Sequence, residues 1–140
     1  LRNTILPFRN PKRGDIVVFI YPEDRSKDFI KRVVGVPGDT LEIRDKRIFL
    51  NGLPYNDGHG VYEDPLIIPG AIQPRDNFGP ITVPSESLFV MGDNRDQSYD
   101  SRFWGFVETK DVMGKAMIIY WSWNREAFGV RWDRLGKILH

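Results

Sequence analysis

Short runs of β-branched and aromatic residues recur along the chain, and each is closed by a turn-forming residue such as Gly, Pro or Asp. Such runs are typical of β-strands, because branched and aromatic side chains pack well on a pleated surface. They predict strands over residues 16–21, 28–36, 41–43, 48–50, 87–91 and 115–121. The polar residues 44–47 predict a hairpin, and Asn51-Gly52 predicts a tight turn. The only helical candidate is a short turn near residues 108–111.

Short strands at a spacing of about ten residues favour an all-β fold. We expect a small coiled, barrel-like fold of antiparallel sheets. Residues 53–84, called the arm below, interrupt this pattern, because they hold six of the ten prolines and show little periodicity. The arm is interpreted as an irregular excursion or a long hairpin rather than a second domain. Residues 1–140 are therefore predicted to form one domain, which is long enough to bury a core.

Composition excludes several classes of function. The net charge is only +1, which argues against a nucleic-acid binder that works by neutralising phosphates. The chain has no cysteine and only two histidines, His59 and His140, so neither a disulfide nor a zinc site is expected. It has no run of about eighteen apolar residues, and it opens on Leu1 without the order of a signal peptide. We expect it to be part of a longer protein whose N-terminal portion is missing here.

Lys31 stands inside the apolar run Phe29-Ile30-Lys31-Arg32-Val33. Alternation along a strand places Lys31 on the same face as Phe29 and Val33. Burial there would lower the lysine pKa, and a general base near neutral pH needs a pKa roughly two to three units below the usual value of about 10.4. A serine hydroxyl is suited to orient such an amine. The alternative is a half-exposed lysine whose stem covers apolar surface while its ammonium stays in water.

A second candidate feature is the polar segment 91–105, which follows a predicted strand and ends in the apolar run 103–107. Polar loops held between buried segments commonly carry functional groups.

Three segments together resemble the conserved boxes of type I signal peptidases: Pro11–Phe19, Lys31–Asp39 and Gly92–Arg102. Their order and rough spacing agree with the family, and the resemblance covers residues 11 to about 123. It implies a Ser–Lys dyad protease that removes signal peptides from exported precursors after an Ala-x-Ala pattern. It also implies a cytoplasmic (inner) membrane location in a bacterium, with the catalytic domain on the extracytoplasmic face. The implied partners are signal peptides and the membrane lipid surface, and neither a metal nor a cofactor is implied.

Carried over to this sequence, the resemblance makes Lys31 the general base and Ser98 the serine that hydrogen-bonds it. Asp100 and Arg102 match an ion pair that braces the loop, and Gly92 matches a position close to the lysine. The substrate pockets of the family fall at Asp28, Phe29 and Ile30, although plain core packing is an equal reading for these three positions.

One part of the family pattern has no counterpart in this chain. The family's nucleophilic serine lies in a Ser-Met-x-Pro segment upstream of the first box, and none of the six serines here precedes Met-x-Pro. Ser98 and Ser101 are rejected as nucleophiles, because the resemblance gives Ser98 the orienting role. The membrane anchor and part of the oxyanion hole are absent for the same reason, so this chain alone is expected to be inactive. Four aromatic residues could form a membrane-facing patch or could pack in the core: Trp121, Trp123, Phe128 and Trp132.

Two other readings stay open from the sequence. A self-cleaving repressor-type domain uses the same Ser–Lys chemistry but is not expected to carry the segment Gly92–Arg102. A non-catalytic β-domain that binds exported peptides is the alternative from a different class of function.

Overall fold

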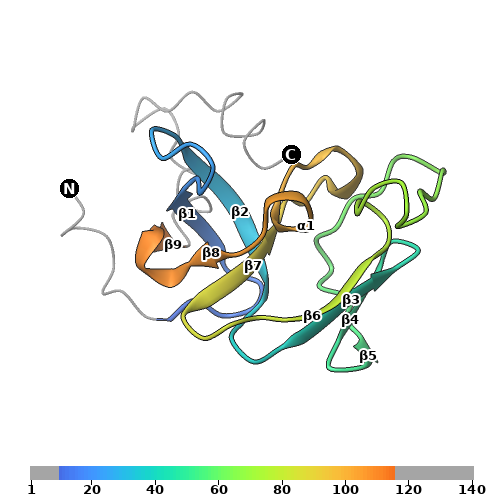
Figure 1. Cartoon of the computed structure of the whole chain (residues 1–140), viewed down its shortest axis with the longest axis horizontal. Helices are drawn as coiled ribbons and strands as arrows, with labels where there is room; N and C mark the ends of the chain where they lie inside the picture. The colour runs from blue at the N-terminus through green and yellow to red at the C-terminus, as the bar shows by residue number, and fades with distance from the viewer. Residues whose placement is uncertain (1–9, 116–140) are drawn as a thin grey trace.

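The computed structural model describes residues 10–115 and contains nine strands in two antiparallel sheets (Figure 1). The five-stranded sheet has the order β8-β7-β2-β1-β9, with β1 (Ile16–Ile20), β2 (Asp28–Gly35), β7 (Ser87–Met91), β8 (Val107–Glu108) and β9 (Val112–Lys115). The four-stranded sheet has the order β5-β4-β3-β6, with β3 (Thr40–Arg44), β4 (Arg47–Leu50), β5 (Leu53–Pro54) and β6 (Phe78–Thr82). This confirms the predicted all-β fold of antiparallel sheets. Among the described residues the sheets remain open rather than closing into a barrel.

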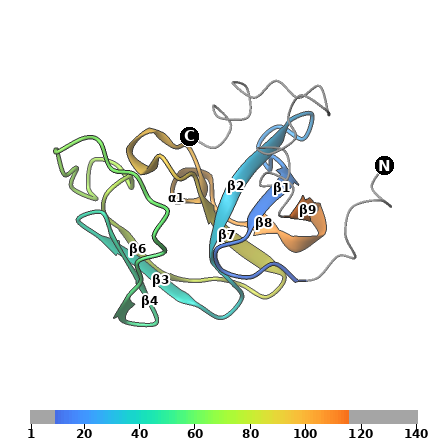
Figure 2. The ribbon, with the colours of Figure 1, turned by 180° about the vertical axis from the view of Figure 1, so that it is seen from behind.

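The helical parts are short. A 3-10 turn at Thr109–Asp111 confirms the helical candidate of the sequence, whereas the 3-10 turn η2 (Arg95–Gln97) and the helix α1 (Ser101–Trp104) were not predicted. The helix α1 packs against β7 and is seen beside it from both sides of the molecule (Figure 2). No helix among residues 10–115 is long and apolar enough to cross a membrane.

The central strands β2 and β7 are buried on both faces. Val33 and Val34 are neighbours in β2, yet they belong to two different hydrophobic clusters. In β7, Val90 lies in the cluster of Val33, and Phe89 lies in the cluster of Val34. Packing on both faces therefore holds β2 and β7 rigidly, together with the side chains that these strands carry.

The two turns of the small sheet follow from the sequence. Asp45 and Lys46 have φ of 47° and 71°, and Asn51 and Gly52 have φ of 54° and 83°. Positive φ at both central residues suits a two-residue hairpin, because its twist matches that of the strands. The predicted hairpin and tight turn are therefore both confirmed.

The arm leaves the small sheet after β5 and returns to it as β6. Its middle part, residues 55–77, has no regular strand, as the green and yellow-green trace of Figure 1 shows. The predicted strand 115–121 and the four C-terminal aromatic residues lie outside the described part of the chain, apart from Lys115 at the end of β9.

Candidate active site

Lys31 is buried in the middle of β2, where only 3% of its surface is exposed. It pairs with Val17 of β1, and the alternation of the strand puts it on the face of Phe29 and Val33, as the sequence predicted. Its Nζ lies 5.8 Å from the centre of the Phe29 ring. Burial removes the amine from water, which disfavours its charged form.

Burial lowers the pKa of Lys31 to about 8, and two charged neighbours act on it in opposite directions. The carboxylate of Asp100 raises the lysine pKa, and the guanidinium of Arg102 lowers it. Since these two neighbours are bound to each other, their charges largely compensate, and burial remains the main cause of the shift.

Ser98 follows η2 and is brought directly to the lysine. Lys31 Nζ donates to Ser98 Oγ over 3.2 Å, although 67 residues separate the two along the chain. The backbone N–H of Gly92 donates to the same hydroxyl oxygen over 3.1 Å. Both the amine and the backbone therefore fix the hydroxyl, which is itself buried.

Asp100 and Arg102 form a buried ion pair beside this serine. Arg102 Nε and Nη2 each lie 2.9 Å from an oxygen of Asp100. Asp100 also accepts the backbone N–H of Arg102 at the start of α1 and that of Gly92 over 3.1 Å. One carboxylate thus caps α1, neutralises a guanidinium and holds the end of β7.

The three residues expected to line substrate pockets differ in their exposure to solvent. Asp28 is exposed at the start of β2, Phe29 is half-buried and stacks on Tyr21 with ring centres 4.2 Å apart, and Ile30 is buried. The structure therefore brings Lys31, Ser98, Gly92 and the Asp100–Arg102 pair together. It leaves Asp28 at the surface.

Sequence reasoning missed three charged residues of the segment Gly92–Arg102, called the site loop below. Asp93 is held by Arg32 Nε and Nη2 over 2.8 and 2.9 Å, which fixes the loop to β2. Arg95 is fully buried, and its Nε donates to Gly92 O over 2.8 Å. Asp96 is also buried. The only indication of these three residues in the sequence is the high density of charged residues in this short polar segment.

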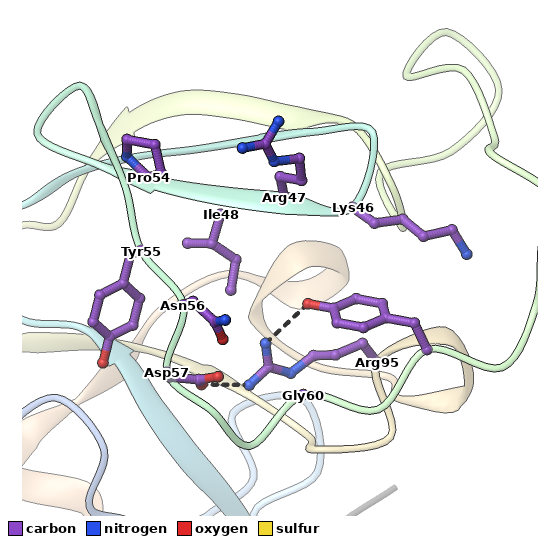
Figure 3. A pocket seen from close by; sticks show the side chains of 10 residues that line it. Lys46, Arg47, Ile48, Pro54, Tyr55, Asn56, Asp57, Gly60 and Arg95 are labelled. Atoms are coloured by element: carbon purple, nitrogen blue, oxygen red, sulfur yellow. Dashed lines mark hydrogen bonds and ion pairs between the residues drawn. The ribbon is translucent and has the colours of Figure 1, made fainter.

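A pocket of about 290 Å³ lies between β4 and the arm (Figure 3). Arg95 reaches into it, where it pairs with Asp57 over 2.6 Å and donates to Tyr62 Oη over 3.3 Å. Neither Lys31 nor Ser98 lines this pocket, so the cavity is separate from the lysine–serine pair. Within residues 10–115, no group of three His, Asp or Glu side chains is arranged to hold a metal ion.

Comparison with known proteins identifies the family. Residues 2–121 match the family model "Signal peptidase, peptidase S26". The chain is 38% identical over 126 residues to a signal peptidase I of Leptolyngbya laminosa, covering 84% of this chain and 57% of that protein. It is 32% identical over 153 residues to a signal peptidase I of Pseudomonas aeruginosa, covering 88% of this chain and 54% of that one. The chain thus spans about half the length of the relatives it matches.

The fold agrees with this match. The crystal structure of a signal peptidase I from Enterococcus faecalis superposes with a TM-score of 0.61 at 30% identity, covering 77% of this chain and 97% of that one. Sequence and fold point to the same group of proteins, and the chain belongs to the signal peptidase family, peptidase S26.

Proposed function

We propose that this chain is the single catalytic domain of a serine endopeptidase of the Ser–Lys dyad type. The parent protein would remove N-terminal signal peptides from exported precursors after an Ala-x-Ala-like site. The observation that carries the proposal is the buried amine of Lys31, which lies 3.2 Å from Ser98 Oγ and has its pKa lowered to about 8. A lysine that is partly neutral near physiological pH can accept a proton.

In the proposed mechanism, neutral Lys31 takes the proton of the nucleophilic serine as the serine oxygen attacks the scissile carbonyl. The lysine then passes that proton to the leaving amine, and an acyl-enzyme is left. Water, activated by the same lysine, hydrolyses the acyl-enzyme in the second half of the reaction. Ser98 orients the amine throughout, because its hydroxyl oxygen is held in turn by the backbone N–H of Gly92.

The nucleophile of this mechanism lies outside the chain. None of the six serines stands in a Ser-Met-x-Pro segment, and Ser98 already has the orienting role. We propose that the parent protein supplies the nucleophile upstream of residue 11, together with part of the oxyanion hole. Residues 1–140 alone are accordingly proposed to be inactive.

The proposed substrate contacts are Asp28, Phe29 and Ile30 in the first part of β2, directly before the lysine. The proposed location is the cytoplasmic (inner) membrane of a bacterium, with this domain on the extracytoplasmic face. Signal peptides and the lipid surface are the proposed partners.

Cleavage of a signal-peptide precursor by the full-length protein tests the proposal, with wild type compared to Lys31→Met. Loss of a general base is expected to lower the cleavage rate about 10²- to 10⁴-fold. Ser98→Ala is expected to lower it as well, because the amine loses its hydroxyl partner. The matched control is Lys27→Met, the same chemical change at an exposed lysine before β2, which is expected to cleave as wild type does.

Circular dichroism checks that each variant is folded. Equal cleavage by wild type and folded Lys31→Met would remove Lys31 as the base and overturn the mechanism. A full-length wild type that binds the precursor but never cuts it would favour the peptide-binding alternative instead.

A further inference from the structure

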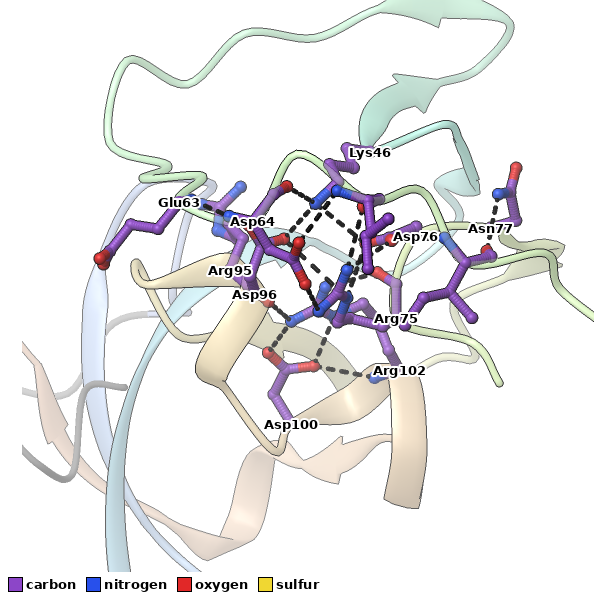
Figure 4. A network of polar contacts seen from close by, with 12 residues as sticks. Lys46, Glu63, Asp64, Arg75, Asp76, Asn77, Arg95, Asp96, Asp100 and Arg102 are labelled. Atoms are coloured by element: carbon purple, nitrogen blue, oxygen red, sulfur yellow. Dashed lines mark hydrogen bonds and ion pairs between the residues drawn. The ribbon is translucent and has the colours of Figure 1, made fainter. Parts of the chain in front are cut away.

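Asp96 connects the site loop to the arm by several hydrogen bonds at once (Figure 4). Its Oδ1 accepts from Lys46 Nζ over 2.8 Å, and its Oδ2 accepts the backbone N–H groups of Glu63 and Asp64 over 2.9 and 2.8 Å. The side chain of Asp96 is almost fully buried, with 1% exposed. One carboxylate of the site loop thus holds the arm and the turn between β3 and β4 together.

The arm is organised by a second set of charges beside Asp96. Arg75 binds Asp76 through Nε and Nη2 over 3.0 and 2.8 Å, and it binds Asp64 over 3.0 Å. Lys46 Nζ lies 3.7 Å from Asp76, and Arg75 Nε lies 4.0 Å from Asp96. These groups form one partly buried cluster, in which the position of Arg75 depends on the carboxylates that surround it.

Arg102 links this cluster to the site. Its Nη1 donates to the backbone O of Arg75 over 2.6 Å, and its Nη2 donates to the backbone O of Arg95 over 2.7 Å. Nε and Nη2 of the same guanidinium also donate to Asp100, which in turn accepts the N–H of Gly92. A continuous path of hydrogen bonds and ion pairs therefore runs from the arm through Arg102 and Asp100 to the backbone that supports Ser98.

We propose that Asp96 is a positioning residue of the site: it docks the arm on the site loop, and the docked arm holds Arg102 in the place where it pairs with Asp100 beside Lys31. The arm is then part of the scaffold of the active site rather than an excursion without a role. The inference rests on the proposed function in taking Lys31 and Ser98 as the reacting site.

Loss of the Asp96 charge has a definite consequence in this arrangement. A neutral amide at position 96 offers one acceptor oxygen in place of two, so Lys46 Nζ and the N–H groups of Glu63 and Asp64 can no longer all be satisfied. This part of the arm is then held less tightly on the site loop, and Arg75 can shift away from Arg102. A displaced Arg102 no longer offsets the charge of Asp100, and that charge raises the pKa of the Lys31 amine. Asp100 raises the pKa of that amine and Arg102 lowers it, so with Arg102 displaced the lysine binds its proton more tightly.

Direct titration of Lys31 tests the inference without relying on catalysis. The full-length protein is labelled with ε-¹³C lysine, and the Lys31 signal is assigned by its absence from Lys31→Met. In Asp96→Asn the Lys31 pKa is expected to rise by about one unit, the size typical of a neighbouring charge that has moved. Hydrogen exchange at Glu63 and Asp64 is expected to accelerate in the same variant, because a neutral amide oxygen is a weaker acceptor for their N–H groups than the carboxylate.

Asp39→Asn is the matched control. Asp39 is also a buried carboxylate that accepts from an arginine, an asparagine and a backbone N–H, but its partners Arg13, Asn51 and Val36 lie outside the site. This variant is expected to lose stability and keep the Lys31 pKa of the wild type. If Asp96→Asn fails to fold, Lys46→Met carries the test, since it removes one donor to Asp96.

The possible outcomes distinguish the positioning role of Asp96 from the proposed function of Lys31 and Ser98. A lowered pKa in wild type that is unchanged in folded Asp96→Asn would overturn the positioning role and leave the proposed function standing. A wild-type Lys31 that titrates near the ordinary value of about 10.4 would overturn both. An equal rise in Asp39→Asn would assign the effect to general loosening of the fold and would also overturn the positioning role.

Discussion

Burial of Lys31 lowers the stability of the folded chain, because an amine that is charged in water loses its hydration in the protein interior. Its pKa in the folded chain is about 8, against about 10.4 for an unperturbed lysine. Between these two values the unfolded chain binds more protons than the folded chain, so stability rises with pH across that window. The free energy of unfolding is accordingly about 3 kcal/mol lower below pH 8 than well above pH 10.4, where the lysine is neutral in both the folded and the unfolded chain.

Lys31→Met is therefore expected to gain stability relative to wild type, and the gain should depend on pH. The difference between variant and wild type should be larger at pH 6 than at pH 10, by up to about 3 kcal/mol. Urea unfolding of both proteins at pH 6, 8 and 10 measures it, and Lys27→Met shows the contribution of an exposed lysine. A difference that is the same at all three pH values would mean that Lys31 keeps an ordinary pKa.

At the scale of residues, only part of the site could be predicted from the sequence. Lys31 stood out from its surroundings alone, since a cation in an apolar strand is unusual. Ser98 was found only through the resemblance to a family. Arg95 and Asp96 were not recognised, because their partners Asp57 and Lys46 lie 38 and 50 residues away and no local pattern records such pairs.

At the scale of elements, the turn at Asn51 shows why short-range signals predict well. Asn51 adopts a φ of 54°, which asparagine tolerates better than most residues. Its side chain adds two bonds: Oδ1 accepts the N–H of Thr40 over 2.9 Å, and Nδ2 donates to Asp39 over 3.2 Å. Backbone preference and side-chain bonding therefore both favour this turn.

Two substitutions separate these contributions. Asn51→Gly keeps the freedom to adopt positive φ and loses the two side-chain bonds, whereas Asn51→Ala loses both. We expect Asn51→Ala to cost about 1–3 kcal/mol of unfolding free energy and Asn51→Gly to cost less. Urea unfolding at neutral pH gives the order. Equal losses in the two variants would show that the backbone conformation contributes nothing.

Elements without a local sequence pattern could not be predicted. The helix α1 has only four residues, too few for a helical period to be seen, and it depends on the cap from Asp100. The strand β6 lies inside the arm and contains Pro80, which argues against a strand in the middle of a sheet. It is tolerated because β6 is an edge strand of the small sheet, where proline need not donate to a neighbour.

At the scale of the whole molecule, the sequence predicted the class of the fold but not how its two sheets meet. Strand periodicity shows that β2 and β7 are apolar, and it cannot show which of their faces contacts which sheet. The junction lies at Gly35, the last residue of β2. A Cβ placed there would lie 3.1 Å from Val83 Cγ2, 3.2 Å from Phe89 Cβ and 3.4 Å from Leu41 Cδ1.

Gly35 therefore allows the two sheets to pack closely, and a double-mutant cycle tests this. Gly35 is not among the glycines with positive φ, so alanine fits the backbone and only crowding should matter. Gly35→Ala is expected to cost about 1–3 kcal/mol through overpacking. In the double variant with Val83→Ala, the loss should be smaller than the sum of the single losses by more than about 0.5 kcal/mol, because the shortened Val83 makes room. If the losses of unfolding free energy measured in urea are additive, the added methyl group is accommodated by movement elsewhere. Close packing at Gly35 would then not determine how the two sheets meet.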